Sequence, residues 1–190
     1  MVQGSGLSNV TDEWSLLDRA RLGVKSAWGE LLRLHQSRLT AMALLITGSG
    51  DSAKDIVQEV FTRLIRVEFQ HRQGTLSGWL STATWRLAVK EKDRTTKLSG
   101  LESFVEPFES ESQLDTLIKD ERSRQIAVAI RDLSNEHREC LILRFYGEHS
   151  YEEIAELTGV PLGTVKSRLF HAVKSCREIL RRKGVLDSCI

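Results

Sequence analysis

Residues 150–171 constrain the fold more than any other part of the chain, because they indicate two helices separated by a tight turn. Ser150 can cap the first helix, and Glu153, three residues later, completes a capping box. Gly159 suits the left-handed position that ends a helix. Pro161 cannot extend that helix but can begin the next one. Two helices joined by a short turn that contains glycine form a helix–turn–helix, which is a DNA-binding arrangement.

The second helix of this pair has two chemically different faces. At about 100° per residue, one face collects the small and apolar side chains that we expect in the core, namely Val165, Leu169, Ala172 and Cys176. The opposite face offers cations for phosphates and side chains that can reach base edges, namely Lys166, Ser167, Phe170, His171 and Lys174. An outward Phe170 can pack on a thymine methyl group.

Charge supports a DNA-facing surface locally, although the whole chain has a net charge of only +1. Between Gly163 and Lys183, seven basic residues stand against one acid, Glu178. The preceding helix has three acids instead, Glu152, Glu153 and Glu156. A cationic helix beside an acidic supporting helix is typical of a DNA-binding domain. The alternative is a three-helix protein-binding domain with a solvated basic face.

Composition places the chain among soluble globular proteins of one domain or two small ones. Its 190 residues are 41% hydrophobic and 28% charged, which is ordinary for that class. No apolar run approaches the roughly 20 residues of a membrane span, and the first residues lack the features of a signal peptide. Three widely spaced cysteines, Cys140, Cys176 and Cys189, indicate a reducing compartment and not a disulfide framework. We therefore predict a cytoplasmic protein.

The hydrophobic pattern predicts helices and no strands. Helices are expected at about 11–22, 27–46, 52–70 and 76–97, with Ser52 and Asp55 in capping-box positions of the third and a loop over 70–75. At about residue 98 the composition becomes acidic and rich in serine, which indicates a flexible linker. Helices then resume at about 114 and continue to Lys183. The prediction is an all-α protein with two helical domains, 1–97 and 114–190, joined by a linker over 98–113.

Several motifs resemble those of bacterial RNA polymerase sigma factors, specifically the small two-domain extracytoplasmic-function type. In the carboxy-terminal part the match covers Leu133-Ser134, Leu141–Tyr146 and Ser150–Arg168, and its most specific signature is the run Gly163–Arg168. In the amino-terminal part, Asp51–Phe61 resembles the polymerase-binding helix of the family. Trp79-Leu80 and Leu87–Val89 resemble the segment that engages the melted promoter strand.

The resemblance implies three sets of contact residues. For the upstream promoter element in duplex DNA they are Thr164, Lys166, Ser167, Arg168, Phe170, His171 and Lys174. For the downstream element, where single strands are captured by stacking and by cations, they are His71, Arg72, Trp85, Arg86 and Lys90. For a basic coiled coil of the polymerase largest subunit they are Asp51, Asp55, Gln58 and Glu59, where complementary charge would speed encounter. Spacing alone also fits a solvated acidic helix face.

Some residues depart from the family pattern in the downstream-element segment. Arg86 stands where the family usually has Asn, and Leu76 replaces an aromatic residue. The loop over 70–75 lacks the common Phe-Arg-Gly start. The base preference of this segment therefore cannot be carried over from the family. Trp79 is expected in the core, and Trp85 fits a core position and a strand-binding position equally well.

The predicted function is that of a non-catalytic sigma factor, monomeric when free and without cofactors. It would bind core polymerase through the coiled coil and the flap, and it would recognise promoter DNA both double-stranded and melted. An anti-sigma factor would control its activity. The alternatives are a response-regulator-like transcription factor, which would need strands before residue 97, and a module that binds polymerase without DNA. Glu68 and His71 have di-iron spacing without a second such motif, and His137 and Cys140 lack the second pair of a zinc site.

Overall fold

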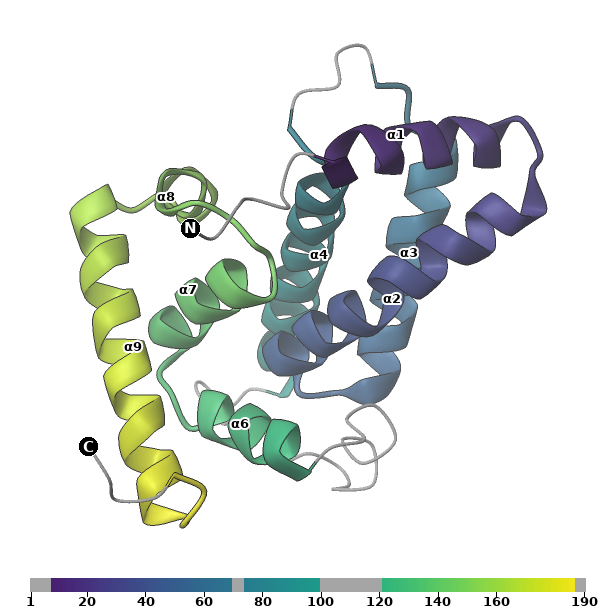
Figure 1. Ribbon diagram of the computed structural model, residues 1–190. Helices are drawn as coiled ribbons and strands as arrows, with labels where there is room; N and C mark the ends of the chain where they lie inside the picture. The colour runs from purple at the N-terminus through teal and green to yellow at the C-terminus, as the bar shows by residue number, and fades with distance from the viewer. Residues whose placement is uncertain (1–7, 70–73, 100–120, 187–190) are drawn as a thin grey trace.

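The computed structural model describes residues 8–69, 74–99 and 121–186, and its regular structure in these ranges consists of eight α-helices. The predicted all-α fold class is confirmed. Figure 1 shows the helices of the amino-terminal half on one side of the molecule and those of the carboxy-terminal half on the other. Most of the predicted linker lies outside the described residues. Leu98 is part of a helix, so that helix extends past the predicted boundary at residue 97.

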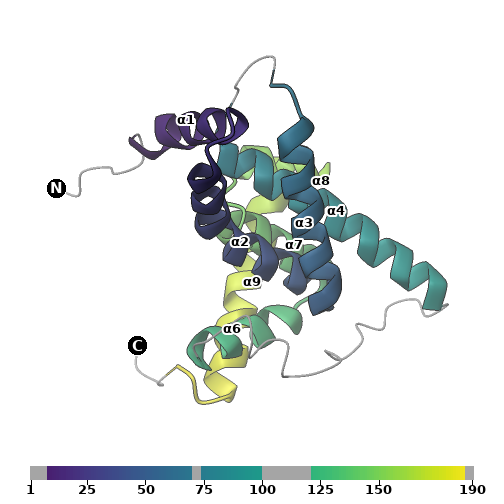
Figure 2. The same ribbon diagram turned by 90° about the vertical axis from the view of Figure 1, so that its right-hand side faces the viewer.

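Four helices form the amino-terminal half: α1 (Ser8–Arg21), α2 (Lys25–Thr47), α3 (Gly50–Arg66) and α4 (Leu76–Ser99). The second of these is central and packs against the other three. Its fully buried side chains include Leu31, Leu39, Met42 and Leu44. The last turns of α4 extend beyond the bundle (Figure 2), where the side chains of residues 93–98 are exposed.

The start of α3 differs from the prediction. Gly48 has a left-handed φ of 76° and ends α2 by donating its N–H to the Leu44 carbonyl at 2.8 Å. Ser49 then has extended backbone, and its hydroxyl accepts the Ser52 N–H at 3.3 Å. The expected capping box of Ser52 and Asp55 is therefore wrong, because the chain needs only one residue between the left-handed glycine and the next helix.

The first helix holds together the two ends of the connection from α3 to α4. Arg21 donates to the carbonyls of Leu64, at 2.8 Å, and Val67, which caps the end of α3. The ring of Phe69 meets Trp14 edge-on with centroids 4.9 Å apart, and it meets Trp79 in the same way at 5.4 Å. The predicted helix up to residue 70 therefore ends early, at Arg66, because Phe69 leaves the helix to enter this aromatic cluster.

The far end of the connection is also fixed by α1. The Trp14 indole N–H donates to the Gly74 carbonyl at 3.4 Å, and the Glu13 carboxylate accepts the Ser77 N–H at 3.2 Å in the first turn of α4. Trp79 is half-buried and packs against the core, as expected. The predicted strand-binding residues His71 and Arg72 lie outside the described residues.

Four more helices form the carboxy-terminal half: α6 (Glu121–Arg131), α7 (Asn135–Phe145), α8 (Tyr151–Thr158) and α9 (Leu162–Arg182). Among these, α9 packs against the other three, and beside it α7 also packs against α8 (Figure 1). Arg138 of α7 is only 4% exposed and donates to the Leu133 carbonyl at 2.9 Å and to the Arg131 carbonyl. A buried cation thus satisfies the last carbonyl of α6 and the Leu133 carbonyl in the turn that follows.

The two halves contact each other where α6 and α7 pack on α2 and where α7 and the turn after it form hydrogen bonds with α4. The guanidinium of Arg38 on α2 donates to the Tyr146 carbonyl and, at 2.6 Å, to the Ser77 hydroxyl. None of the eight described helices combines the length and the apolar character that crossing a lipid bilayer requires.

Candidate nucleic-acid interface

The helix–turn–helix forms as the sequence predicts. Ser150 accepts the Glu153 N–H at 3.1 Å, and the Glu153 carboxylate accepts the Ser150 N–H at 2.7 Å, so the capping box is complete. Gly159 has a left-handed φ of 71° and donates to the Ala155 carbonyl at 2.9 Å, which ends α8. Pro161 precedes the first residue of α9, and its carbonyl accepts the first N–H bonds of that helix.

The core face of α9 is confirmed. Val165 and Ala172 are fully buried and Leu169 is 5% exposed, while Cys176 is half-buried. Burial raises the pKa of the Cys176 thiol to about 11 and also raises the pKa of the Cys140 thiol. Both cysteines are free, and their thiols stay protonated at neutral pH.

The opposite face of α9 is open to solvent. Lys166, Ser167, His171 and Lys174 are exposed, and Phe170 keeps 67% of its surface exposed. The Phe170 and His171 rings meet edge-on with centroids 5.4 Å apart. A helix that offers an apolar ring, an imidazole and cations on one open face can enter a major groove.

Two residues predicted to contact DNA are less exposed to solvent than the others. Thr164 is half-buried in the first turn of α9. Arg168 is also half-buried, and its positive charge lies near Glu136 and Cys140 of α7. Arg168 therefore ties α9 to α7, and its cation is already engaged within the protein.

The predicted polymerase-binding stripe is a continuous exposed face of α3. Asp51, Asp55, Gln58 and Glu59 are all exposed. Two of the acids pair with cations of the same helix, Asp51 with Lys54 at 3.3 Å and Glu59 with Arg63 at 2.7 Å. Exposed ion pairs of this kind contribute about 0–1 kcal/mol to stability. The acids can therefore exchange these cations for those of a basic partner surface at little cost.

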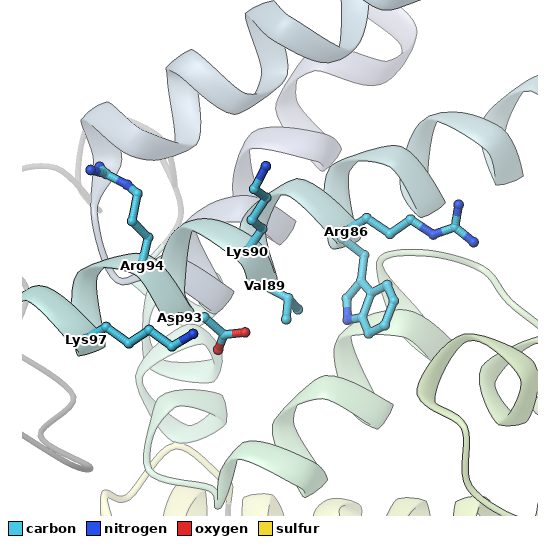
Figure 3. Close-up of a pocket in the computed structure, with 7 residues that line it drawn as sticks. Arg86, Val89, Lys90, Asp93, Arg94 and Lys97 are labelled. Carbon is cyan, nitrogen blue, oxygen red and sulfur yellow. The ribbon is translucent and has the colours of Figure 1, made fainter.

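A pocket of about 520 Å³ lies along α4. It brings together Trp85, Arg86 and Lys90, the described residues of the set predicted to bind the melted DNA strand. Its lining consists of Trp85, Arg86, Val89, Lys90, Asp93, Arg94 and Lys97. Figure 3 shows Lys90 and Arg94 projecting to the same side of α4, while Val89 lies on a different side. Asp93 is the one acid among four cations in this lining. An aromatic ring on which bases can stack, beside several cations, is the chemistry that captures single-stranded nucleic acid.

Trp85 is half-buried, and its indole nitrogen is enclosed without a hydrogen-bond partner. The residue thus borders the pocket with one part of its ring and packs against the core with another. Sequence spacing did not decide between these two environments.

The metal-site candidates do not assemble in the residues that the structure describes, where no three His, Cys, Asp or Glu side chains gather as a metal would need. Cys140 is fully buried in α7. His137 is half-buried and its ring lies 6.2 Å from that of His171, centroid to centroid.

Sequence reasoning missed the residues that join the two halves. Ser81 on α4 is fully buried, and its hydroxyl lies 3.1 Å from the Gly147 carbonyl and 3.2 Å from Nε2 of His149. Lys92, also on α4, donates to Asn135 Oδ1 at 2.8 Å. No pattern in the sequence singles out Ser81, because its helical neighbours include Ser77 and Thr84.

Comparison with known families finds two matches. The family described as "Sigma-70 region 2" matches residues 31–97, and "Sigma-70, region 4" matches residues 123–176. The matched ranges contain the described α4 pocket residues, the α3 stripe and most of α9.

Among curated proteins, the chain is similar to the "ECF RNA polymerase sigma factor SigL" of Mycobacterium tuberculosis, with 31% identity over 181 residues that cover 86% of this chain and 96% of the relative. It is 29% identical over 161 residues to the "ECF RNA polymerase sigma factor SigE" of Mycolicibacterium smegmatis, covering 82% of this chain. That alignment spans 62% of the relative, which is less than two thirds of its length.

Among solved structures, the sigma factor RpoE of Bartonella quintana, crystallised with the anti-sigma factor NepR, superposes with a TM-score of 0.59. The two are 23% identical, and the superposition covers 81% of this chain and 96% of that one. This likeness concerns the fold.

Proposed function

Because the chain belongs to the extracytoplasmic-function sigma factors of RNA polymerase, we propose that it joins core polymerase as a non-catalytic subunit and directs initiation at a specific set of promoters. It acts where the polymerase does, in the cytoplasm, and is monomeric when free. The observation that supports this most directly is the sorting of α9 into a buried apolar face and an exposed face with two cations, a ring and an imidazole.

The exposed face of α9 reads the upstream promoter element. Lys166 and Lys174 contact phosphates, while Ser167, Phe170 and His171 are placed to reach base edges. Thr164 lies at the amino-terminal end of α9, where a recognition helix approaches the groove. Arg168 supports the position of this helix from the side of α7, and its contribution to DNA contact is smaller than that of Lys166.

The exposed acids of α3 dock on a basic surface of core polymerase, for which the proposed partner is the coiled coil of the largest subunit. Asp55 lies at the middle of the stripe, and Asp51 and Glu59 lie one turn to either side. The carboxy-terminal half adds a contact with the polymerase flap. Two weak attachments on one chain raise each other's effective concentration, so neither has to be strong alone.

The α4 pocket holds the melted strand of the downstream element. Trp85 offers a surface for stacking, and Arg86 and Lys90 meet the phosphates beside it. His71 and Arg72, in the connection between α3 and α4, complete this proposed set. Because Arg86 stands where the family usually has Asn, the base preference of the family does not carry over to this pocket.

An anti-sigma factor regulates the protein under this proposal. The supporting observation is that the Bartonella quintana relative in fold was crystallised with one. The binding partner would cover surfaces that polymerase or DNA otherwise uses.

The test separates the DNA-binding role from the polymerase-binding role. In a transcription assay with core polymerase and a random promoter library, Lys166→Glu should weaken transcription about uniformly across upstream elements, because a phosphate contact carries no sequence information, and polymerase association should be retained. Asp55→Lys should reduce polymerase association and leave the fold of α9 unchanged. Matched controls are the exposed Lys25→Glu and Glu30→Lys on α2, which make the same charge changes.

A module that binds polymerase without DNA predicts a different result. In that case Lys166→Glu would leave promoter-dependent transcription unchanged, and the proposed DNA-binding role of α9 would be wrong. A loss of both activities in both variants, accompanied by unfolding in circular dichroism, would contradict the separation of roles between the two halves.

A further inference from the structure

Arg86 is the one arginine of the α4 pocket whose guanidinium is not engaged within the described part of the chain. Its side chain is exposed, and no hydrogen bond or ion pair joins it to another described residue. Arg94, the other arginine of the lining, donates two hydrogen bonds to the Glu91 carboxylate, at 2.7 and 2.9 Å. Figure 3 shows Arg86 projecting in a different direction from Lys90 and Arg94. The donors of Arg86 are therefore available to a ligand.

The neighbouring tryptophan cannot identify a base by hydrogen bonding. The indole nitrogen of Trp85 is enclosed, so the part of the ring that borders the pocket offers only a surface for stacking. Stacking tolerates any base, because every base has a π-face. A preference for one base must therefore come from another side chain near Trp85, and Arg86 follows it directly in the chain.

The other charged residues of the pocket lie farther along α4. At a rise of about 1.5 Å per residue, Lys90 lies roughly 7.5 Å from Trp85 along the helix axis, and Asp93 lies roughly 12 Å from it. Lys90 is a flexible point charge, which suits a phosphate. The guanidinium of Arg86 is instead a planar fork of five N–H donors without an acceptor. The charged group nearest to the stacking surface therefore selects a base edge that offers two acceptors.

Guanine is the base with such an edge. Its O6 and N7 both accept hydrogen bonds and lie side by side, and a bidentate contact from arginine to these two atoms is the commonest specific contact between proteins and bases. Adenine has N7 beside an amino group that donates, so arginine satisfies only one of its two positions. Both acceptors of guanine stay accessible in the major groove of a base pair. The same edge is therefore available before and after the strands separate.

We propose that Arg86 is a specificity-determining residue of the α4 pocket and selects a guanine in the downstream element, beside the base that stacks on Trp85. The inference rests on the proposed function of this pocket in strand binding, and it gives Arg86 a base to read in addition to a phosphate. An asparagine at this position would match adenine instead, through N6 and N7. Exchanging the two residues should therefore exchange the preferred base.

The test uses polymerase holoenzyme reconstituted with the full chain and a promoter library randomised across the downstream element. A transcribed barcode identifies each promoter, so sequencing the transcripts gives the enrichment of every base at every position. Wild type should enrich guanine at one position, on one strand, by about 5- to 150-fold over the other bases. Arg86→Asn should enrich adenine at that position. Arg86→Lys should retain guanine with a weaker preference, because lysine lacks the planar fork.

Two matched variants serve as controls. Lys90→Asn removes a cation from the same pocket and should lower transcription about equally for all sequences, because a phosphate contact carries no base information. Arg33→Asn makes the same residue change as Arg86→Asn at an exposed position of α2 and should keep the base enrichment of wild type.

A modified promoter tests the contacted edge directly. 7-Deazaguanine in place of the selected guanine removes the N7 acceptor and keeps the pairing with cytosine. Wild type should transcribe this template less well than the unmodified one, and Arg86→Asn should transcribe both equally. Placing the modification on each strand in turn identifies the strand that Arg86 contacts.

The outcomes separate this inference from the function on which it rests. If Arg86→Asn lowers transcription about equally for all sequences, as Lys90→Asn does, Arg86 contacts only phosphate; the selection of guanine is then wrong and the proposed function of the pocket stands. A wild-type preference for another base, or equal transcription of both templates by wild type, would also overturn the selection of guanine. If neither Arg86→Asn nor Lys90→Asn differs from wild type, the α4 pocket itself does not hold the strand.

Discussion

Acidification should destabilise the amino-terminal half through a single buried histidine, His35. This residue lies on α2 with 4% of its surface exposed, and its Nε2 is 3.6 Å from the Glu13 carboxylate of α1. Burial, followed by the positive charge of Arg38 one turn later, lowers the pKa of His35 from 6.5 to about 4. The folded protein therefore keeps this imidazole neutral at pH values where the unfolded chain protonates it.

The sign and size of the effect follow from proton binding. Between about pH 6.5 and about pH 4 the unfolded state binds more protons at His35, so the free energy of unfolding falls as the pH falls through this window. For these two pKa values the loss between about pH 7.5 and about pH 5 is about 2 kcal/mol. Burial raises the pKa of Glu13, which acts in the opposite direction.

Urea denaturation followed by tryptophan fluorescence measures this loss, since all four tryptophans, Trp14, Trp28, Trp79 and Trp85, lie in the amino-terminal half. The control is His35→Gln, whose amide does not titrate. The loss of stability on acidification should be about 2 kcal/mol smaller in His35→Gln than in wild type. Because Glu13 is present in both proteins, its contribution is largely removed by the difference. Identical pH dependence in the two proteins would refute this account of His35.

Two further predictions concern helix ends. Ser150→Ala removes one side of the capping box of α8 and should lower the free energy of unfolding by about 1 kcal/mol, measured by thermal or urea unfolding. Ser150→Asn should retain most of that stability. Equal stability of the wild type and both variants would contradict a role of the cap. Arg138→Met leaves the carbonyls of Arg131 and Leu133 without their buried donor and should cost about 2 kcal/mol, measured by urea unfolding with circular dichroism; an unchanged midpoint would mean that water replaces the guanidinium.

Periodicity was sufficient to predict the four helices of the amino-terminal half and the helix pair α8 and α9, whereas α6 and α7 were predicted only as part of a helical segment that starts at about residue 114. The family resemblance, based on short motifs such as Gly163–Arg168, is confirmed by the comparisons. Helix ends were predicted less well. Ser49 and Ser52 both satisfy the rule for a cap, and only the left-handed backbone of Gly48 decides that Ser49 is used.

Long-range polar contacts were not predictable from spacing. By its position at the end of a short helix, Arg21 would be expected to be a solvated cation. It donates instead to the carbonyls of Leu64 and Val67, 43 and 46 residues later. Ser81 and His149, 68 residues apart, carry no pattern that pairs them. The exposed faces of α3 and α9 were easier to predict. In an amphipathic helix, the periodicity that buries the apolar residues also turns the polar residues outward.

The clasp that α1 forms around the connection between α3 and α4, through Glu13, Trp14 and Arg21, allows the positions inside that connection to vary while its ends stay fixed. Phe69 and Gly74 are fixed by Trp14, and the neighbouring helix ends are fixed by Arg21 and Glu13. The four positions between them can therefore be randomised in a selection experiment without removing any of these anchors. Residues 31–97 match the family, so a recombinant fragment cut at those limits would lose the clasp.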